Sequence, residues 1–512
     1  MQDIRHSTIA LLFFAVLALV SVPVVTHLMP PLIDYINHLA RTHAISTIAT
    51  DTDLQRFYVV EWRLIPNLMI DLVVPALHRF VNIYVAGQIF TLASLFLILS
   101  GTFALHRALF ARWSALPLVA GIVLYNEVLL VGVMNYIAGI GLALWALAAW
   151  IVLRERAWPW RYAVSTLFVM LLFVCHLFAL GVYGLGLLAF EAHRLWAKRR
   201  EPLAARLVDF AATGAPFIPA ALLLLGSATA GLAPEMYWQL EGKLDGLLLA
   251  FTVYHYWTAY LIIAASAVAI AWAAASGVLR LHPVGWFLLG IGAVIYLAMP
   301  RAVFGSHLAD QRLPAALVFM LIACVDLDLQ RARVRLAFAA FVIGLLAVRL
   351  GEVQLAWNAL APQLAAFRAS ALTIERGARV LVARGDRDAY NRETGTVSDF
   401  GLLHAASLAT LERSAMVSTN FTIAGKQILY VRPQFRDSVD HNDNPPPSAD
   451  WLRRSADPPD ESDRFSWSQW PRKFDYVYVV FARKTDPNPD ERNLRLTVEG
   501  PGFRLYRVIN VR

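Results

Sequence analysis

A cluster of ionisable side chains follows the first long apolar run of the chain. Asp34, His38 and Arg41 stand at positions i, i+4 and i+7 after Pro30-Pro31. If the chain turns helical after the two prolines, this spacing places a carboxylate, an imidazole and a guanidinium on one face. A carboxylate at a membrane surface can act as a general base, so the stretch is a candidate site. In the alternative interpretation, Asp34 is only the N-cap of a surface helix, with His38 and Arg41 on its solvated face.

The loop that carries this cluster, residues 29–81, is far longer than a connection between two helices needs. Its recurring apolar residues predict helices that lie along the membrane plane. The polar residues between them are candidates for substrate contact: Asn37, Glu61, Asn67 and Asp71. Glu61 and Asp71 are expected first of all to pair with Arg63 and Arg56.

Few polar residues stand in the other loops that we place on the same side of the membrane as Asp34. Asn135 stands at a tight turn, where it is either a turn residue or a sugar contact. His176 and His255 are further candidates for substrate contact, although a lone histidine in apolar surroundings is usually a hydrogen-bonded core residue. Arg301 and Arg312 have two possible roles. They hold a lipid phosphate by forked hydrogen bonds, or they are ordinary charges of a loop between spans and bind nothing.

The sequence predicts no cofactor and no metal ligands, but leaves a divalent cation open. Asp51-Thr52-Asp53 has the form of a metal-binding DxD, although a helix cap is the more usual role of such a triplet. Cys175 and Cys324 both lie in apolar runs, so neither a disulfide framework nor a cysteine metal site is expected.

The composition is that of a polytopic membrane protein. Of the 512 residues, 58% are hydrophobic and only 16% are charged, and the mean hydropathy is +0.53. The net charge of +8 is spread through short loops and forms no basic stripe, which argues against nucleic acid as a partner. The first apolar run has no cleavage site before Pro30, and we expect it to be retained as a span.

About eleven apolar segments are long enough to span a bilayer. The region 162–193 has basic residues on both sides, which predicts two short helices that meet near Cys175-His176. The other expected spans are 8–28, 82–105, 115–132, 136–153, 207–228, 256–278, 283–300, 314–329 and 335–351.

The distribution of basic residues predicts the topology. With the N-terminus in the cytoplasm, the cytoplasmic loops hold 15 Lys or Arg and the external loops hold 7. An odd number of spans then places the C-terminus on the same side as Asp34. The 40 Arg against 5 Lys suggest a GC-rich bacterial genome, so we expect an inner-membrane protein whose external side is periplasmic.

We expect two domains, a transmembrane module over 1–351 and an α/β extracytoplasmic domain over 352–512. The second contains 22 basic and 20 acidic side chains, as a soluble domain would. Strands are predicted at 379–383, 427–431 and 474–481, a helix at 399–411, a hairpin at 494–509 and a proline-rich loop at 441–463.

The number of spans, the acidic Asp34 directly after the first span, the long external loop and the C-terminal domain together resemble the GT-C superfamily. Its members are integral membrane glycosyltransferases that use polyprenyl-phosphate-linked sugars. The resemblance implies that Asp34 is the catalytic base. Many members carry paired acidic residues at this position, whereas this chain has Asp34-Tyr35.

The resemblance therefore implies transfer of a sugar from a polyprenyl-phosphate donor to a glycan, lipid or protein acceptor, with inversion at the anomeric carbon. Arg41, Arg301 and Arg312 would stabilise the departing lipid phosphate. Three other functions stay open. A ligase or polymerase of lipid-linked glycans would depend on Arg312 or His255, a transporter would need inverted repeats, and an assembly subunit would use the C-terminal domain for docking.

Overall fold

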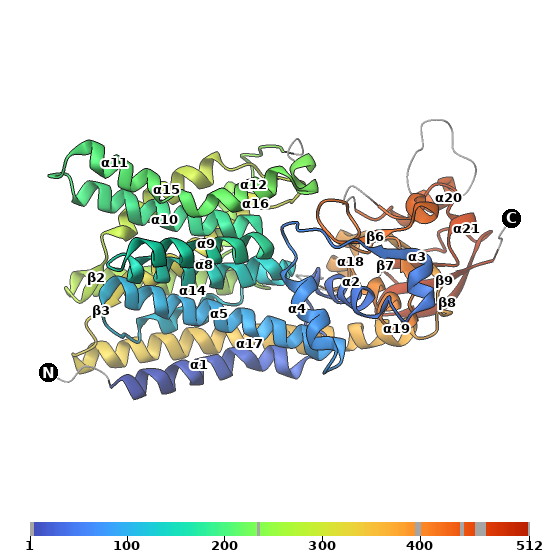
Figure 1. Cartoon of the computed structure of the whole chain (residues 1–512). Coiled ribbons are helices and arrows are strands. Elements are labelled where there is room, and N and C mark those ends of the chain that lie inside the picture. The colour runs from blue at the N-terminus through green and yellow to red at the C-terminus, as the bar shows by residue number, and fades with distance from the viewer. Residues whose placement is uncertain (1–4, 233–235, 395–400, 441–444, 456–466, 510–512) are drawn as a thin grey trace. The chain divides into compact units, whose positions relative to one another are not determined.

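The computed structural model describes residues 5–232, 236–394, 401–440, 445–455 and 467–509 (Figure 1). The chain divides into two compact units. The helical unit comprises Met1–Thr26, Leu64–Met69 and Phe90–Gln354. The mixed unit comprises His27–Arg63, Ile70–Ile89 and Leu355–Arg512. Most of the predicted first external loop therefore belongs to the same compact unit as the C-terminal region.

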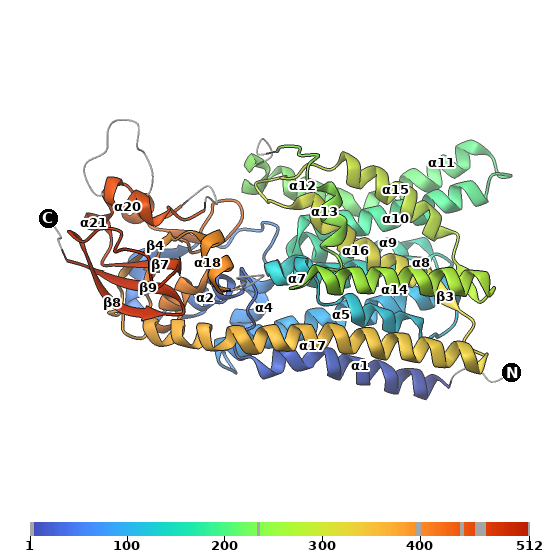
Figure 2. The ribbon, with the colours of Figure 1, turned by 180° about the vertical axis from the view of Figure 1, so that it is seen from behind.

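The helical unit is built from long apolar helices joined by short turns (Figure 2). Two of its helices, α5 and α17, also contribute residues to the mixed unit. Its elements are α1 (His6–Thr26), α5 (Ile83–Phe110), η1 (Leu116–Val119), α6 (Ala120–Val123), α7 (Glu127–Val131), α8 (Met134–Leu153), α9 (Trp158–Cys175), α10 (Leu177–Ala197), α11 (Leu203–Ala212), η2 (Ala215–Phe217), α12 (Ile218–Leu225), η3 (Ala228–Leu232), α13 (Lys243–Leu248), α14 (Tyr256–Ala275), β2 (Leu279–Leu281), α15 (Val284–Ala298), α16 (Ala309–Ala323), β3 (Val325–Leu327) and α17 (Ala332–Ala371).

Within the described residues, seven helices are long and apolar enough to cross a membrane, fewer than the eleven spans expected from the sequence. Seven of the expected spans correspond to these helices: α1, α5, α8, α9, the α11–α12 run, α14 and α17. The helices α15 and α16 have only 15 residues each. The helix α10 has 21 residues but carries charged side chains in its last turns.

The expected span at 115–132 is wrong, because this segment is divided into three short helices. Pro117 lies in the first turn of η1. The Asn126 side chain accepts a hydrogen bond from the Leu129 amide and thereby starts α7. Gly132 then ends α7 in the left-handed conformation, with φ 84°. By contrast, the two helices predicted to meet near Cys175-His176 are confirmed as α9 and α10.

The helices of this unit pack closely where glycines remove side chains. α8 packs against both α9 and α10, and α10 also packs against α15. A Cβ atom at Gly141 of α8 would lie 2.6 Å from the Leu97 carbonyl carbon and 2.8 Å from the Ile98 amide nitrogen of α5. Small residues that let two backbones approach are a usual device in membrane helices, where burial of apolar surface drives little association.

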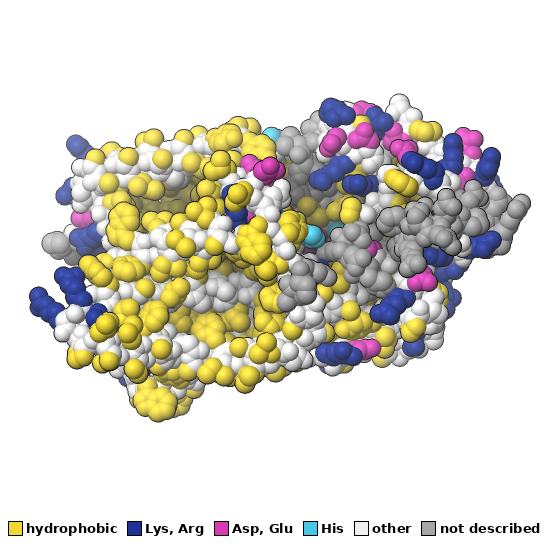
Figure 3. Space-filling model, turned by 90° about the horizontal axis from the view of Figure 1, so that it is seen from above, with side chains coloured by type: hydrophobic (Ala, Val, Ile, Leu, Met, Phe, Trp, Pro, Cys, Tyr) yellow, Lys and Arg dark blue, Asp and Glu magenta, His cyan; other side chains and the backbone are white. Residues whose placement is uncertain are grey.

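The surface of the helical unit is mainly apolar. On the face shown in Figure 3, hydrophobic side chains cover this unit, and Lys and Arg side chains gather at one end of it. The large exposed apolar side chains include Phe14, Leu207, Leu222, Trp257, Trp286 and Leu336. This distribution suits a surface in contact with lipid.

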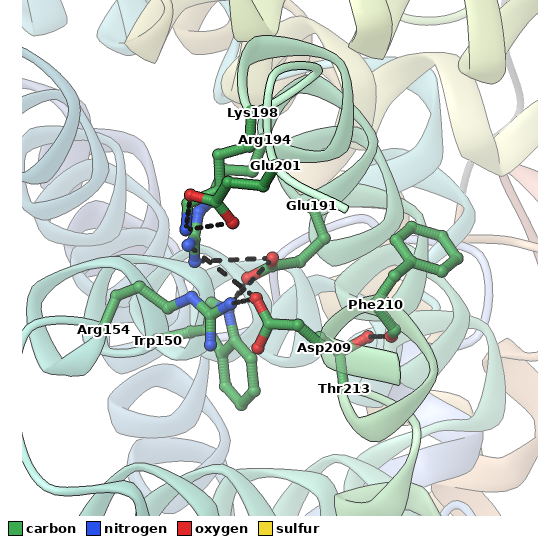
Figure 4. A network of polar contacts seen from close by, with 9 residues as sticks. All are labelled: Trp150, Arg154, Glu191, Arg194, Lys198, Glu201, Asp209, Phe210 and Thr213. Atoms are coloured by element: carbon green, nitrogen blue, oxygen red, sulfur yellow. Dashed lines mark hydrogen bonds and ion pairs between the residues drawn. The ribbon is translucent and has the colours of Figure 1, made fainter. Parts of the chain in front are cut away.

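A charged network joins the ends of α8, α10 and α11 (Figure 4). Arg154 pairs with Glu191 and with Asp209. Glu191 also accepts a hydrogen bond from the Trp150 indole nitrogen at 2.7 Å. Because acids and bases neutralise one another here, we interpret the network as a connection between helices.

The mixed unit contains a five-stranded sheet with the strand order β5-β4-β7-β9-β8. β4 runs parallel to β5 and to β7, and the other two pairs are antiparallel. Its elements are α2 (Tyr35–Thr47), α3 (Thr52–Phe57), β1 (Tyr58–Val60), α4 (Met69–His78), β4 (Arg379–Arg384), α18 (Arg387–Thr394), η4 (Ala405–Ser407), α19 (Leu408–Arg413), β5 (Met416–Val417), β6 (Leu429–Val431), η5 (Pro433–Ser438), α20 (Ala449–Ser455), α21 (Trp470–Lys473), β7 (Tyr476–Ala482), β8 (Leu494–Gly500) and β9 (Gly502–Val508).

The α/β fold predicted for the C-terminal region is confirmed, with three local differences. The strand expected at 474–481 begins two residues later, as β7 (Tyr476–Ala482), and all seven of its residues are buried because it lies inside the sheet. The helix expected at 399–411 begins later, as η4 and α19, and residues 395–400 lie outside the described part. Most of the loop expected at 441–463 also lies outside it, and residues 449–455 form α20.

Segments from the first loop are built into this unit. β1 pairs antiparallel with β6, with Tyr58 opposite Val431 and Val60 opposite Leu429. The Tyr58 hydroxyl accepts a hydrogen bond from Asn420 at 3.0 Å, and burial raises the pKa of Tyr58 to about 12. α2 packs against α19 and η4.

A methyl group added at Gly141 tests the close packing of α8 and α5. Gly141→Ala is expected to destabilise the protein by about 1–3 kcal/mol, because the contacting atoms are backbone and cannot rotate away. Gly344→Ala is the matched control, since a Cβ atom there meets nothing within 4 Å. The unfolding midpoints of both variants are measured by thermal unfolding in detergent. Equal midpoints for the two variants would contradict the close approach.

Candidate functional site

Asp34 stands at the start of a buried helix. It occupies the N-cap position of α2, but its side chain accepts no capping hydrogen bond. The first eight residues of α2 are all buried, so α2 is not the surface helix of the alternative interpretation. A Cβ atom at Gly87 would lie 2.5 Å from the Tyr35 hydroxyl oxygen and 2.6 Å from a Leu39 methyl carbon, which shows how closely α5 approaches α2.

The Asp34 carboxylate faces an imidazole from the C-terminal region. Oδ1 of Asp34 lies 3.6 Å from Nε2 of His404, and the two side chains are 21% and 14% exposed. Nδ1 of His404 lies 3.1 Å from Nδ2 of Asn37, which follows Asp34 by three residues. The rings of His404 and Phe421 pack in an edge-type arrangement at a centroid distance of 5.2 Å. A partly exposed carboxylate is thus held beside an oriented imidazole.

Three of the residues predicted from the sequence surround this pair. Asn37 is fully buried and touches His404 directly. The buried ring of His38 packs on the same Phe421, at 5.3 Å. Arg41 lies one turn further along α2, with its guanidinium carbon 5.9 Å from the Phe421 centroid.

Arg41 was predicted to bind lipid phosphate, but the structure pairs it with Asp71 of α4. Nε of Arg41 lies 2.8 Å from Oδ1 of Asp71, and both side chains are 0% exposed. Burial raises the pKa of the Asp71 carboxyl, and the adjacent Arg41 opposes this effect. The expected pairing of Asp71 with Arg56 is wrong, since Arg56 donates to the Gly377 carbonyl. Arg41 therefore holds α2 against α4.

Two other predictions in the first loop are confirmed. Glu61 pairs with Arg63 at 2.7 Å, and both side chains are well exposed. Asp51 is a helix cap, because it accepts hydrogen bonds from the Asp53 and Leu54 amides at the start of α3. Among the residues described, no group of three or more His, Cys, Asp or Glu side chains is arranged to hold a metal ion.

A second cluster of predicted residues lies within the helical unit. Asn135 donates to the side-chain oxygen and to the carbonyl of Asn67, both at 2.8 Å. His176 caps α10 by accepting a hydrogen bond from the Phe178 amide, and its ring packs on Tyr136 at 5.6 Å. The structure therefore places Asn135 at the start of α8, where it binds the segment Leu64–Met69.

Arg312 belongs to the same cluster. The Tyr136 hydroxyl donates to the Arg312 carbonyl at 2.9 Å, and the Arg312 guanidinium lies over the Phe178 ring at 5.9 Å. Tyr136 and Phe178 also line an apolar cavity of about 270 Å³ between α8, α10, α15 and α16. The remaining lining residues are almost all apolar and include Leu177, Val182, Leu185, Ile295, Met299 and Leu313.

Arg301 and His255 lie apart from both clusters. Arg301 is buried and pairs with Asp310, which also pairs with Lys243 at 2.9 Å. This ion group joins α13 to the start of α16, so the phosphate-binding role predicted for Arg301 is not favoured. His255 precedes α14, and its Nδ1 lies 3.3 Å from Glu352 of α17.

Sequence reasoning missed His404. It lies 367 residues after Asn37, and no spacing rule connects them. The only local signal is that His404 is the single ionisable residue between Gly401 and Leu411.

No protein-family model and no curated protein sequence matches the chain. Among solved structures, the arabinofuranosyltransferase AftD from mycobacteria matches 100% of this chain, with a TM-score of 0.50 and 15% identity. The match covers 40% of AftD, so this chain spans less than half of its length. ArnT from Cupriavidus metallidurans, solved with undecaprenyl phosphate, matches over 98% of both chains, with a TM-score of 0.43 and 12% identity. At 15% identity the similarity to AftD concerns the fold alone, and it agrees with the multi-pass helical membrane fold predicted from the sequence.

Truncation of Asp71 tests the Arg41–Asp71 pair. Asp71→Ala leaves a buried guanidinium without its carboxylate and is expected to destabilise the protein by about 3–5 kcal/mol. Glu61→Ala breaks an exposed pair and should cost less than about 1 kcal/mol. Unfolding of the purified variants in detergent gives both values. A double variant, Arg41→Met with Asp71→Leu, should recover much of the loss; no recovery would mean that the pair is not the cause.

Proposed function

We propose that this chain is a glycosyltransferase of the bacterial inner membrane. It transfers a sugar from a polyprenyl-phosphate donor to an acceptor hydroxyl on the periplasmic side. One observation carries the proposal: Asp34 stands at a helix start without capping it and points its carboxylate toward an oriented imidazole. A carboxylate that serves only the helix would turn to the amides of the first turn.

The proposed reaction needs one base. The acceptor oxygen forms a bond to the anomeric carbon while its proton passes to the Asp34 carboxylate. The bond between the anomeric carbon and the phosphate oxygen breaks, and its electron pair leaves with the lipid phosphate. Because the phosphate departs as an anion, it needs cations and no general acid. A single displacement without a covalent intermediate inverts the anomeric carbon.

We assign the lipid phosphate to Arg312 in preference to Arg41 and Arg301. The latter two are buried, whereas the Arg312 side chain is half-buried beside an apolar cavity. A planar guanidinium matches a phosphate by two parallel hydrogen bonds. The apolar cavity between α8, α10, α15 and α16 would take part of the polyprenyl chain.

The topology belongs to the same proposal. With the N-terminus in the cytoplasm, Asp34 and the C-terminal region both lie in the periplasm, where a lipid-linked donor and a glycan, lipid or protein acceptor would meet. The domains assigned from the sequence, 1–351 and 352–512, are retained with one change: residues 29–63 and 70–81 act together with the second.

Substitution of Asp34 tests the base. Asp34→Asn keeps the size of the side chain but cannot accept a proton, and is expected to lower the transfer rate by about 10²–10⁴-fold. The assay follows release of free lipid phosphate by purified protein in detergent from a panel of undecaprenyl-phosphate sugars. Asp53→Asn is the control, because Asp53 binds Arg376 at the surface and should keep the wild-type rate.

The outcomes separate the possibilities. Equal release by wild type and Asp34→Asn would support the proposed class of donor and would mean that another residue is the base. No release by either protein with any donor and acceptor of the panel would favour a transporter or an assembly subunit.

Arg312 can be tested in the same assay. Arg312→Ala is expected to lower kcat/KM by about 10²–10³-fold, because a charge that stabilises the leaving phosphate is lost. Arg312→Lys keeps the positive charge but cannot form the two parallel hydrogen bonds, and should lower kcat/KM by a smaller factor. Arg333→Ala, at an exposed position at the start of α17, is the control. Loss of activity at Arg312 or His255 with none at Asp34 would instead indicate a ligase or polymerase of lipid-linked glycans.

A further inference from the structure

We propose that His404 is a positioning residue for Asp34, held as the neutral tautomer with its proton on Nε2. The inference rests on the proposed function of Asp34 as the base. It assigns to the C-terminal region a direct part in the reaction. Asn37 sets the tautomer, and the chain of contacts that leads to it can be followed atom by atom.

The orientation of the Asn37 side-chain amide is fixed by two backbone groups. Its Oδ1 accepts a hydrogen bond from the Phe421 amide at 2.9 Å, and its Nδ2 donates to the Thr419 carbonyl at 2.8 Å. A flip of the amide would place two donors together at Phe421 and two acceptors together at Thr419. Asn37 is fully buried, so water cannot compensate for such a mismatch.

The second hydrogen of Asn37 Nδ2 points to His404 Nδ1, at 3.1 Å. Nδ1 must therefore accept, and a neutral imidazole that accepts at Nδ1 carries its hydrogen on Nε2. Nε2 is the atom that faces Asp34 Oδ1. An imidazolium would place an N–H of His404 against an N–H of Asn37, so the contact with Asn37 disfavours the charged form.

This tautomer suits a base better than a cation would. A positive charge beside Asp34 would stabilise the carboxylate strongly and weaken it as a proton acceptor. A neutral N–H orients the carboxylate with a smaller effect on its basicity. The separation of 3.6 Å is slightly longer than a hydrogen bond, and catalytic hydrogen bonds often tighten only when substrate binds. His404 itself is not the base, because one ring nitrogen faces Asn37 and the other faces Asp34.

Several ionisable groups on the described elements packed around this pair have contacts of their own. Arg41 of α2 pairs with Asp71 of α4, and His38 packs on Phe421. On α19, Glu412 pairs with Arg368 and Arg413 donates to the Leu372 carbonyl, and Tyr58 of β1 stays protonated. His404 faces Asp34 directly, so its replacement should move the pH dependence of Asp34.

The test is the pH profile of kcat/KM with the undecaprenyl-phosphate sugar on which wild type is active. His404→Ala removes a donor from the carboxylate and should raise the pKa of Asp34, so the acidic limb moves up by about one pH unit. The rate should also fall, by up to about 100-fold. The amide of His404→Gln can still donate to Asp34. This variant should therefore keep most of the wild-type rate, and its acidic limb should lie close to that of wild type.

A change at Asn37 should act in the opposite direction. Asn37→Asp offers His404 Nδ1 a carboxylate, which favours the imidazolium and lowers the pKa of Asp34, so the acidic limb moves to lower pH. Thr410→Val is the control for damage to packing in the same region, because Thr410 binds the Ala415 carbonyl and Asn420 but not His404. It should lower the melting temperature and leave the acidic limb where it is. Unshifted limbs in both His404→Ala and Asn37→Asp would overturn the inference while the function of Asp34 stands.

A second measurement needs no activity. Nitrogen NMR of protein labelled with ¹⁵N-histidine, compared with His404→Gln to assign the resonance, reports which ring nitrogen carries the proton. A signal from unprotonated Nδ1 is expected at neutral pH. A protonated Nδ1 would overturn the inference even if Asp34→Asn is inactive. An unprotonated Nδ1 in a protein without transferase activity would support the contact and refute the function.

Discussion

The pairing of β1 with β6 is the constraint on which the candidate site depends. It joins Tyr58–Val60 to Leu429–Val431, and the Tyr58–Asn420 hydrogen bond connects residues 362 positions apart. These contacts place the first loop among the C-terminal elements, so that α2 packs against η4 and α19. Asp34 comes from the start of this loop and His404 from the C-terminal region. Neither segment alone contains the site.

The membrane part of the fold could be predicted because its signals are local. Long apolar runs identify the spanning helices, and basic residues on both sides of 162–193 required two helices, which are α9 and α10. The prediction was wrong at 115–132, where the hydrophobicity is sufficient but Pro117, Asn126 and Gly132 divide the segment. Hydropathy measures the preference for lipid and does not register these helix ends.

The candidate site could be predicted only in part, for a related reason. Asp34, Asn37 and His38 share one short segment, and helical spacing brings them together. Their partners come from remote positions: His404 for Asp34, Asp71 for Arg41, and Asn67 for Asn135. Spacing could suggest that Arg41 was available for a phosphate, but not that Asp71 would neutralise it. Chemical type is visible in the sequence, whereas pairing depends on the tertiary fold.

The mixed unit is discontinuous in the chain, and this has a consequence for biosynthesis. Its first segments, His27–Arg63 and Ile70–Ile89, are synthesised long before Leu355–Arg512. Until the last segment emerges, the face of α2 that packs against η4 and α19 has no partner to cover it. Folding of this unit is therefore a late event of high contact order, completed only after the whole membrane part has been made. A chain that stops before η4 would keep its spanning helices but would expose this face of α2, which makes it a natural substrate for quality control.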